Sequence, residues 1–458
     1  MLAPTLAGEP RGLVVIAPAE FRAALEPLLA ARATERPVEF LALESVALDS
    51  TAADGTRIDP PESIKRALYQ RWREQNVGYA LLVGDAETFP VRFMVLDRVT
   101  EPAFHTAFYP SDLYYADVAR EDGSFDDWNA SREGHRARYF GEVHGEHRKS
   151  GPINTDAVSY VPELAVGRFP VRDAAGTAAL VAKTLAHAPA AAPRALIVHA
   201  DGWIDARDRA GAMAASLASR GFWVEAQLFG SEPTPASATT DGSGADAAPR
   251  AEKPAYRSTG TPGPERVLGL LRAGVELALH LGHGSEQGWH DCLGPAEREP
   301  LLTSPPAVIL SIGCSTAHFV AEPPYQAYLD ERGVPHLGTN AGERFDGPPP
   351  PPHWLQPGRF AAAGFGADLV RAPRGGALVY IGCTTGAQPC ALTLQEAFQE
   401  VLRTAQAPCV GDAWRIALTR YHERERLASL VPDDGWYPPS IFFQGMKFVF
   451  LGDPTLRL

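Results

Sequence analysis

Short apolar runs alternate with helical stretches along most of this 458-residue chain. The runs have the length and residue types of buried strands, and the stretches between them repeat apolar residues at helical spacing. This alternation predicts an α/β fold whose mostly parallel sheets are flanked by helices. The expected strands are Leu13–Ile16, Phe40–Leu43, Tyr79–Val83, Ala195–His199, Trp223–Leu228, Glu276–Leu281, Ala307–Ile312 and Ala377–Ile381, and the expected helices are Glu20–Arg32, Glu62–Glu74 and Ala174–His187.

The strand and helix series divides near Pro189–Pro193. We therefore expect an N-terminal α/β subdomain over residues 1–190 and a second α/β subdomain over residues 191–458. Two insertions interrupt the second one. Residues 231–264 are rich in small and polar residues, which favours a loop or linker, whereas residues 319–360 contain five consecutive prolines that favour a stiff, extended segment. Either insertion could face a substrate or simply decorate the surface.

Two residues with reactive side chains closely follow two of these strands. His283 comes after Glu276–Leu281, and Cys314 comes after Ala307–Ile312. Because the carboxyl ends of neighbouring parallel strands meet at one edge of a sheet, we expect the imidazole and the thiol to lie together. A neighbouring imidazole that takes the thiol proton creates a strong nucleophile. The pattern therefore predicts the chemistry of a cysteine protease.

Five segments of the chain, taken in order, resemble the gingipain (C25) family of caspase-like cysteine peptidases. They are LLVGD at Leu81–Asp85, SDLYY at Ser111–Tyr115, LAVGRFPVR at Leu164–Arg172, HLGHGSEQGW from His280, and FLGDPTLRL at Phe450–Leu458. The resemblance implies a caspase-like second subdomain and an endopeptidase that forms an acyl-enzyme on Cys314, with His283 as acid and base. It also implies that the backbone N–H groups of Gly284 and Cys314 hold the oxyanion.

The resemblance further implies a third catalytic group and a pocket for a basic residue. Asp201 stands where gingipains have a glutamate, and its shorter side chain either orients the imidazole or caps a turn. Asp205 or Asp208 would form an acidic pocket floor that selects Arg or Lys before the cleaved bond, unless both are solvated acids at a helix start. Cys383 and Thr384 stand where the family lines that pocket with small residues.

Three other functions deserve consideration. A zinc site of His280, His283, His290 and Cys292 is disfavoured because no second cysteine pair follows. The catalytic chemistry requires no cofactor. Calcium could serve as a structural ion in an oxygen-rich stretch that could equally be an acidic surface loop. The oxygen-bearing residues of this stretch are Asp117, Asp122, Asp126, Asp127, Asn129 and Glu142. A catalytically inactive caspase-like binding or scaffold protein is the third alternative.

Composition limits the partners and the compartment. A net charge of −13 argues against nucleic acid and anionic membranes as main partners and suits a protein or peptide substrate. A separate regulatory protein is another expected partner. No apolar run is long enough to span a bilayer, and Met1–Pro10 lacks the layout of a signal peptide, so we expect a cytoplasmic protein, or a secreted one if a leader has been removed. Five cysteines in so long a chain predict free thiols.

Overall fold

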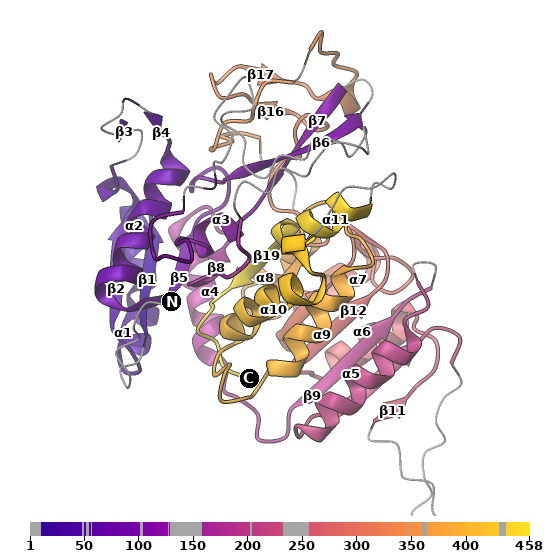
Figure 1. Cartoon of the computed structure of the whole chain (residues 1–458). Helices are drawn as coiled ribbons and strands as arrows, with labels where there is room; N and C mark the ends of the chain where they lie inside the picture. Colours follow the sequence, from indigo (N-terminus) through magenta and orange to yellow (C-terminus); the bar gives the residue numbers. More distant parts are fainter. Residues whose placement is uncertain are drawn as a thin grey trace, which may run out of the picture.

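A single large sheet runs through the whole chain (Figure 1). The computed structural model describes residues 11–47, 50–51, 55, 57–100, 104–126, 128, 158–201, 204–231, 256–347, 349–359, 364–429 and 437–458. In spatial order the strands of the sheet are β11 (Arg257–Ser258), β10 (Trp223–Leu228), β9 (Arg194–His199), β12 (Leu277–Leu281), β15 (Ala307–Ser311), β18 (Ala377–Cys383), β19 (Phe448–Gly452), β8 (Ala165–Phe169), β5 (Val77–Val83), β1 (Gly12–Ala17) and β2 (Val38–Ala42). The pairing of β18 with β19 is antiparallel, and all other pairings in this sheet are parallel, as the sequence predicts.

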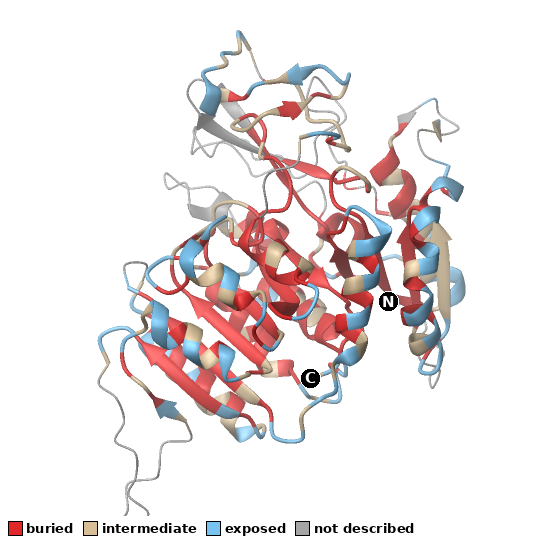
Figure 2. Cartoon of the chain, turned by 180° about the vertical axis from the view of Figure 1, so that it is seen from behind, coloured by how far each residue is buried: buried red, intermediate tan, exposed pale blue. Residues whose placement is uncertain are grey.

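Helices cover both faces of the sheet. Along β1, Val14 and Ile16 contribute to one hydrophobic core, whereas Leu13 and Val15 contribute to the other. The first face is covered by α2 (Pro60–Gln75), α5 (Arg207–Ser219), α9 (Ala391–Val401) and α10 (Val410–Arg424), and the second by α1 (Arg22–Ala33), α4 (Ala174–Ala186), α6 (Pro264–Arg272), α7 (Pro295–Leu301) and α8 (Phe365–Arg371). The central strands are consequently buried on both sides (Figure 2), which explains their near-continuous apolar sequences.

Three strands of the sheet were not among the sequence-based expectations: the two-residue β11 at its edge, and the longer β8 and β19 in its interior. β8 carries Arg168 in its middle, and a charged residue normally argues against a buried strand. Here the guanidinium is fully buried and donates two hydrogen bonds of 2.7 Å to the carboxylate of Asp112. The other interior strand is β19, which pairs with β18 on one side and with β8, at Leu451 and Arg168, on the other. This last strand makes the sheet continuous between the two expected subdomains. The division of the chain near residue 190 stays a prediction.

The insertion after β15 is folded and contacts the N-terminal part of the chain. It contains the short strands β16 (Tyr328–Leu329) and β17 (Pro335–His336), which lie near the hairpin of β6 (Phe93–Thr100) and β7 (Phe104–Pro110) (Figure 1). The Phe108 N–H donates to the Pro323 carbonyl at 2.9 Å, and the Gln356 N–H donates to the Ala86 carbonyl at 2.7 Å. Of the other insertion, residues 232–255 lie outside the described residues, and the remainder forms β11 and the start of α6.

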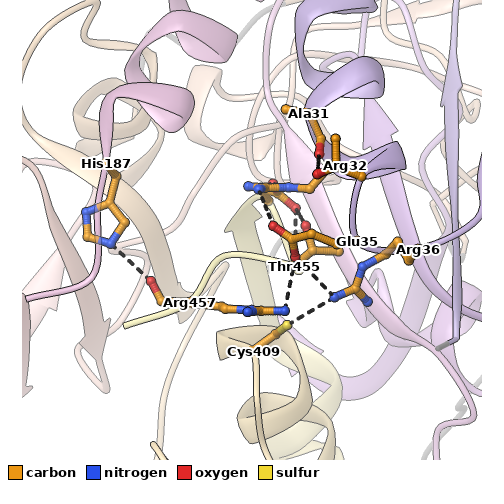
Figure 3. Close-up of polar contacts among 10 residues, drawn as sticks. Ala31, Arg32, Glu35, Arg36, His187, Cys409, Thr455 and Arg457 are labelled. Carbon is orange, nitrogen blue, oxygen red and sulfur yellow. Dashed lines mark hydrogen bonds and ion pairs between the residues drawn. The ribbon is translucent and has the colours of Figure 1, made fainter. Parts of the chain in front are cut away.

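The C-terminal segment ties several helices together (Figure 3). Asp453 accepts two hydrogen bonds from Arg32 of α1, at 3.0 and 2.7 Å. Arg457 forms an ion pair of 3.1 Å with Glu35, and its carbonyl lies 3.0 Å from Nε2 of His187, which follows α4. The FLGDPTLRL motif therefore links α1 and the end of α4 to the last strand of the sheet. Within the described residues, no helix combines the length and hydropathy needed to cross a bilayer.

Candidate active site

Two neighbouring strand ends form the centre of the site. β12 and β15 pair with a constant separation of 31 residues, with Leu277 opposite Val308 and His280 opposite Ser311. His283 and Cys314 each lie three residues beyond that last pair, so they share the same separation. The loops touch, because a Cβ atom added to Gly284 would lie 3.1 Å from the Gly313 Cα and 3.2 Å from the Cys314 carbonyl oxygen. A side chain at position 284 would therefore push the two loops apart.

A buried polar network lies beneath these loops. His280 is fully buried, stacks on Trp289 with ring centroids 4.4 Å apart, and has its Nδ1 2.8 Å from the Ser311 hydroxyl. The same hydroxyl accepts hydrogen bonds from the Gly313 N–H and the Thr316 hydroxyl, both at 3.2 Å. Burial, reinforced by neighbouring histidines, lowers the pKa of His280 to about 3. A neutral imidazole therefore joins the ends of the two strands.

Cys314 is the accessible thiol of the chain. It is half-buried, whereas Cys292, Cys383, Cys390 and Cys409 are buried. Burial raises the pKa of both Cys292 and Cys383 to about 12, which leaves these thiols protonated and unreactive. The chain reverses directly after Cys314, since Ser315 adopts the left-handed conformation with φ of 53°.

The loop that follows β18, residues 384–388, forms one wall beside the thiol, and we call it the β18 loop. The Ala387 N–H donates to the Cys314 Sγ at 3.3 Å, and the Ser315 N–H donates to the Thr385 carbonyl at 2.8 Å. The side chains of Cys383 and Thr384, expected to line a pocket, are themselves buried. The Thr384 hydroxyl donates to the Lys447 carbonyl at 3.0 Å. These two side chains support the loop, while Ala387, absent from the sequence-based candidates, contacts the thiol.

The acidic candidates all lie after β9. Asp201 is exposed, and no described residue hydrogen-bonds to its carboxylate. Asp205 is exposed and is bound by Arg207 at 2.6 and 2.8 Å, and these hydrogen bonds lower the pKa of Asp205 to about 2. Asp208 is exposed in the first turn of α5. The carboxylate of Asp205 is thus already neutralised within the chain, whereas that of Asp208 faces solvent.

The geometry offers no support for a zinc site. Among the described residues, no group of three His, Cys, Asp or Glu side chains is arranged to hold a metal ion. His290 is exposed, with its ring centroid 6.1 Å from that of His283, but His280 is bound to Ser311 and Cys292 is buried. For the calcium prediction, Asp117 and Asp126 are buried and Asp122 is exposed. The other candidates, Asp127, Asn129 and Glu142, fall outside the described residues, so that site stays a prediction.

Comparison with known proteins agrees with this chemistry. The sequence profile of peptidase family C25 matches residues 7–458. The chain belongs to peptidase family C25. This C25 member is therefore a cysteine-type endopeptidase with protein or peptide substrates. No curated protein matches its sequence.

Solved structures show the same fold at low sequence identity. The crystal structure of the Arg-specific cysteine proteinase gingipain R (RgpB) superposes with a TM-score of 0.59 and 14% identity, over 99% of this chain and 79% of that one. The complex of the pro- and mature domains of RgpB from Porphyromonas gingivalis gives a TM-score of 0.57 and 14% identity, over 98% and 79% of the two chains. The caspase-like α/β architecture expected from the sequence is thus confirmed.

Proposed function

We propose that this C25 peptidase cleaves peptide bonds with Cys314 as nucleophile and His283 as general acid and base. The observation that supports this assignment most strongly is the contact between the two strand-end loops, where Gly284 meets Gly313 and the Cys314 carbonyl. The accessibility of Cys314 among five cysteines adds independent support.

The proposed reaction proceeds through an acyl-enzyme. His283 takes the thiol proton, and the Cys314 Sγ attacks the carbonyl carbon of the substrate. The N–H groups of Gly284 and Cys314 donate to the oxyanion of the tetrahedral intermediate, and a bare glycine allows the substrate this close approach. The imidazolium then protonates the leaving amine. In the second half, His283 removes a proton from water, which hydrolyses the thioester. Asp201 is the candidate to orient the imidazole in this scheme, and it would have to turn toward His283 to do so, because no described residue hydrogen-bonds to its carboxylate in the structure.

Cleavage after Arg or Lys is the proposed specificity. A structure with the same fold is that of an Arg-specific cysteine proteinase, and the net charge of −13 favours basic substrates. Of the two acidic candidates, we favour Asp208 because Arg207 already occupies the carboxylate of Asp205. Control by a separate regulatory protein is also proposed, by analogy with the relative solved together with its pro-domain.

Two variants and a substrate scan test the assignment. Cys314→Ala should abolish hydrolysis of a fluorogenic peptide library, and His283→Ala should reduce turnover by roughly 10²- to 10⁴-fold. Iodoacetamide should label Cys314 faster than the four buried cysteines. Equal labelling together with undetectable hydrolysis by the wild type would favour the inactive scaffold. Asp208→Asn should lower the preference for Arg and Lys more than Asp205→Asn does, and a preference for neutral residues would exclude the acidic pocket.

A further inference from the structure

The β18 loop approaches the Cys314 thiol with its backbone. The Ala387 N–H points at the sulfur, with 3.3 Å between nitrogen and Sγ, and the Ala387 carbonyl oxygen lies 3.8 Å from the same sulfur. A protonated thiol can donate to that carbonyl, whereas a thiolate can accept from the N–H group. Because a hydrogen bond to the charged form favours ionisation, the N–H group acts on the step that activates the nucleophile.

A buried glutamine fixes the position of this loop. The side chain of Gln444, at the end of α11 (Tyr437–Gln444), is fully buried. Its Oε1 accepts a hydrogen bond of 2.8 Å from the N–H of Gln388, the residue after Ala387, and its Nε2 lies 4.0 Å from the Cys383 Sγ. Gln444 thus contacts the last residue of the loop and, in β18, the residue just before the loop through one rigid amide group.

Lys447 reinforces the same attachment. Its carbonyl accepts from the Thr384 N–H at 2.8 Å, and its Nζ lies 3.5 Å from the Gly386 carbonyl oxygen. On the opposite side, Thr385 and Cys383 accept hydrogen bonds from the N–H groups of Ser315 and Ala317. The loop is therefore held between the segment that precedes β19 and the turn that carries the nucleophile.

We propose that the Ala387 N–H group stabilises the ionised Cys314 thiol, and that Gln444 is the positioning residue that holds this donor in place. The inference rests on the proposed function of Cys314 and adds a donor separate from the oxyanion groups and from His283. The other ionisable groups around this site are His283 after β12, Cys383 in β18, Lys447 before β19 and Glu322 in the insertion, the last two acting electrostatically on Cys383. None of these would replace an N–H group directed at the sulfur.

Substitutions at two positions separate this role from general stability. Ala387→Pro removes the N–H donor, whereas Ala387→Gly keeps it and removes a methyl group. Gln444→Met removes the acceptor for the Gln388 N–H at similar side-chain volume. The matched control is Gln399→Met. Gln399, in α9, is also a buried glutamine, but its Oε1 accepts a hydrogen bond of 2.6 Å from Arg220, away from the loop.

The measurement is the rate of iodoacetamide reaction at Cys314 as a function of pH, followed by peptide mass spectrometry. In Ala387→Pro and Gln444→Met, iodoacetamide should react with Cys314 near neutral pH roughly tenfold more slowly than in the wild type, because the thiolate has lost its N–H donor. The turnover number should fall with it while KM changes little. Both control variants should keep the wild-type profile.

The reaction rates of these variants distinguish a failure of this inference from a failure of the proposed function. A folded Ala387→Pro or Gln444→Met variant in which Cys314 reacts at the wild-type rate would overturn the inference and leave the proposed function intact. A wild-type Cys314 that reacts with iodoacetamide no faster than free cysteine, with no peptide hydrolysis, would overturn both. If neither variant folds, His283→Ala decides: without the imidazolium, a Cys314 that still reacts with iodoacetamide faster than free cysteine near neutral pH supports the donor, and a rate equal to that of free cysteine contradicts it.

Discussion

Acid should destabilise this peptidase through His280, the buried histidine beneath the two strand-end loops that carry His283 and Cys314. Burial lowers the pKa of His280 to about 3 in the folded protein, from an ordinary value of 6.5. Between pH values of about 3 and 6.5, His280 is therefore protonated in the unfolded chain and neutral in the folded chain. The stabilisation is complete above the unfolded pKa of 6.5 and is lost as the pH falls towards the folded pKa.

The size of this effect follows from the two pKa values. Each pH unit inside the window corresponds to about 1.4 kcal/mol. Between about pH 7.5 and about pH 5, the contribution of His280 to the free energy of unfolding should fall by about 2 kcal/mol. The imidazole is fully buried, so solvent screens this effect little.

Urea denaturation at the two pH values measures this difference. His280→Gln removes the titration and keeps a polar side chain near Ser311, so the variant should lose about 2 kcal/mol less than the wild type on acidification. His187→Gln is the control, since His187 lies outside this buried network and contacts the Arg457 carbonyl. Equal losses in the wild type and His280→Gln would refute the argument that burial keeps this imidazole neutral.

Two further predictions concern the site and the insertion before α6. Gly284→Ala should lower kcat/KM by roughly 100-fold or more, because the new Cβ would lie 2.5 Å from the Thr316 Cγ2 and separate the two loops. Gly386→Ala is the control and should be nearly neutral, because its Cβ would meet no atom within 4 Å. Equal activities of the two variants would contradict this account of the loops. Concentrated wild-type protein should also cut itself after Arg250, Lys253 or Arg257. Arg257 is exposed in β11, and the other two residues lie outside the described residues. Intact mass spectrometry of aged wild type and Cys314→Ala checks this prediction, and identical masses would rule out self-cleavage.

The sequence alone determined the elements whose signal is local. Apolar runs bounded by turn residues located β1, β5, β9, β10, β12, β15 and β18 to within about two residues at each end, because a strand buried on both faces needs a continuous apolar sequence. The same signal placed His283 and Cys314 at adjacent strand ends, and their separation of 31 residues matches the register of β12 and β15. These features required no knowledge of distant contacts.

Tertiary structure alone decided the features that depend on partners far away in the chain. Arg168 could enter a buried strand only because Asp112, 56 residues earlier, neutralises it. Ala387 lies 73 residues after Cys314, and Gln444 a further 56 residues after Gln388, so neither periodicity nor spacing could indicate that they meet at the thiol. A backbone N–H group also carries no residue-type signal, since all residues except proline have one. The proposed nucleophile and base are thus visible in the sequence, whereas the N–H donor to the thiol is brought into place by the packing of the last strand and helix against the sheet.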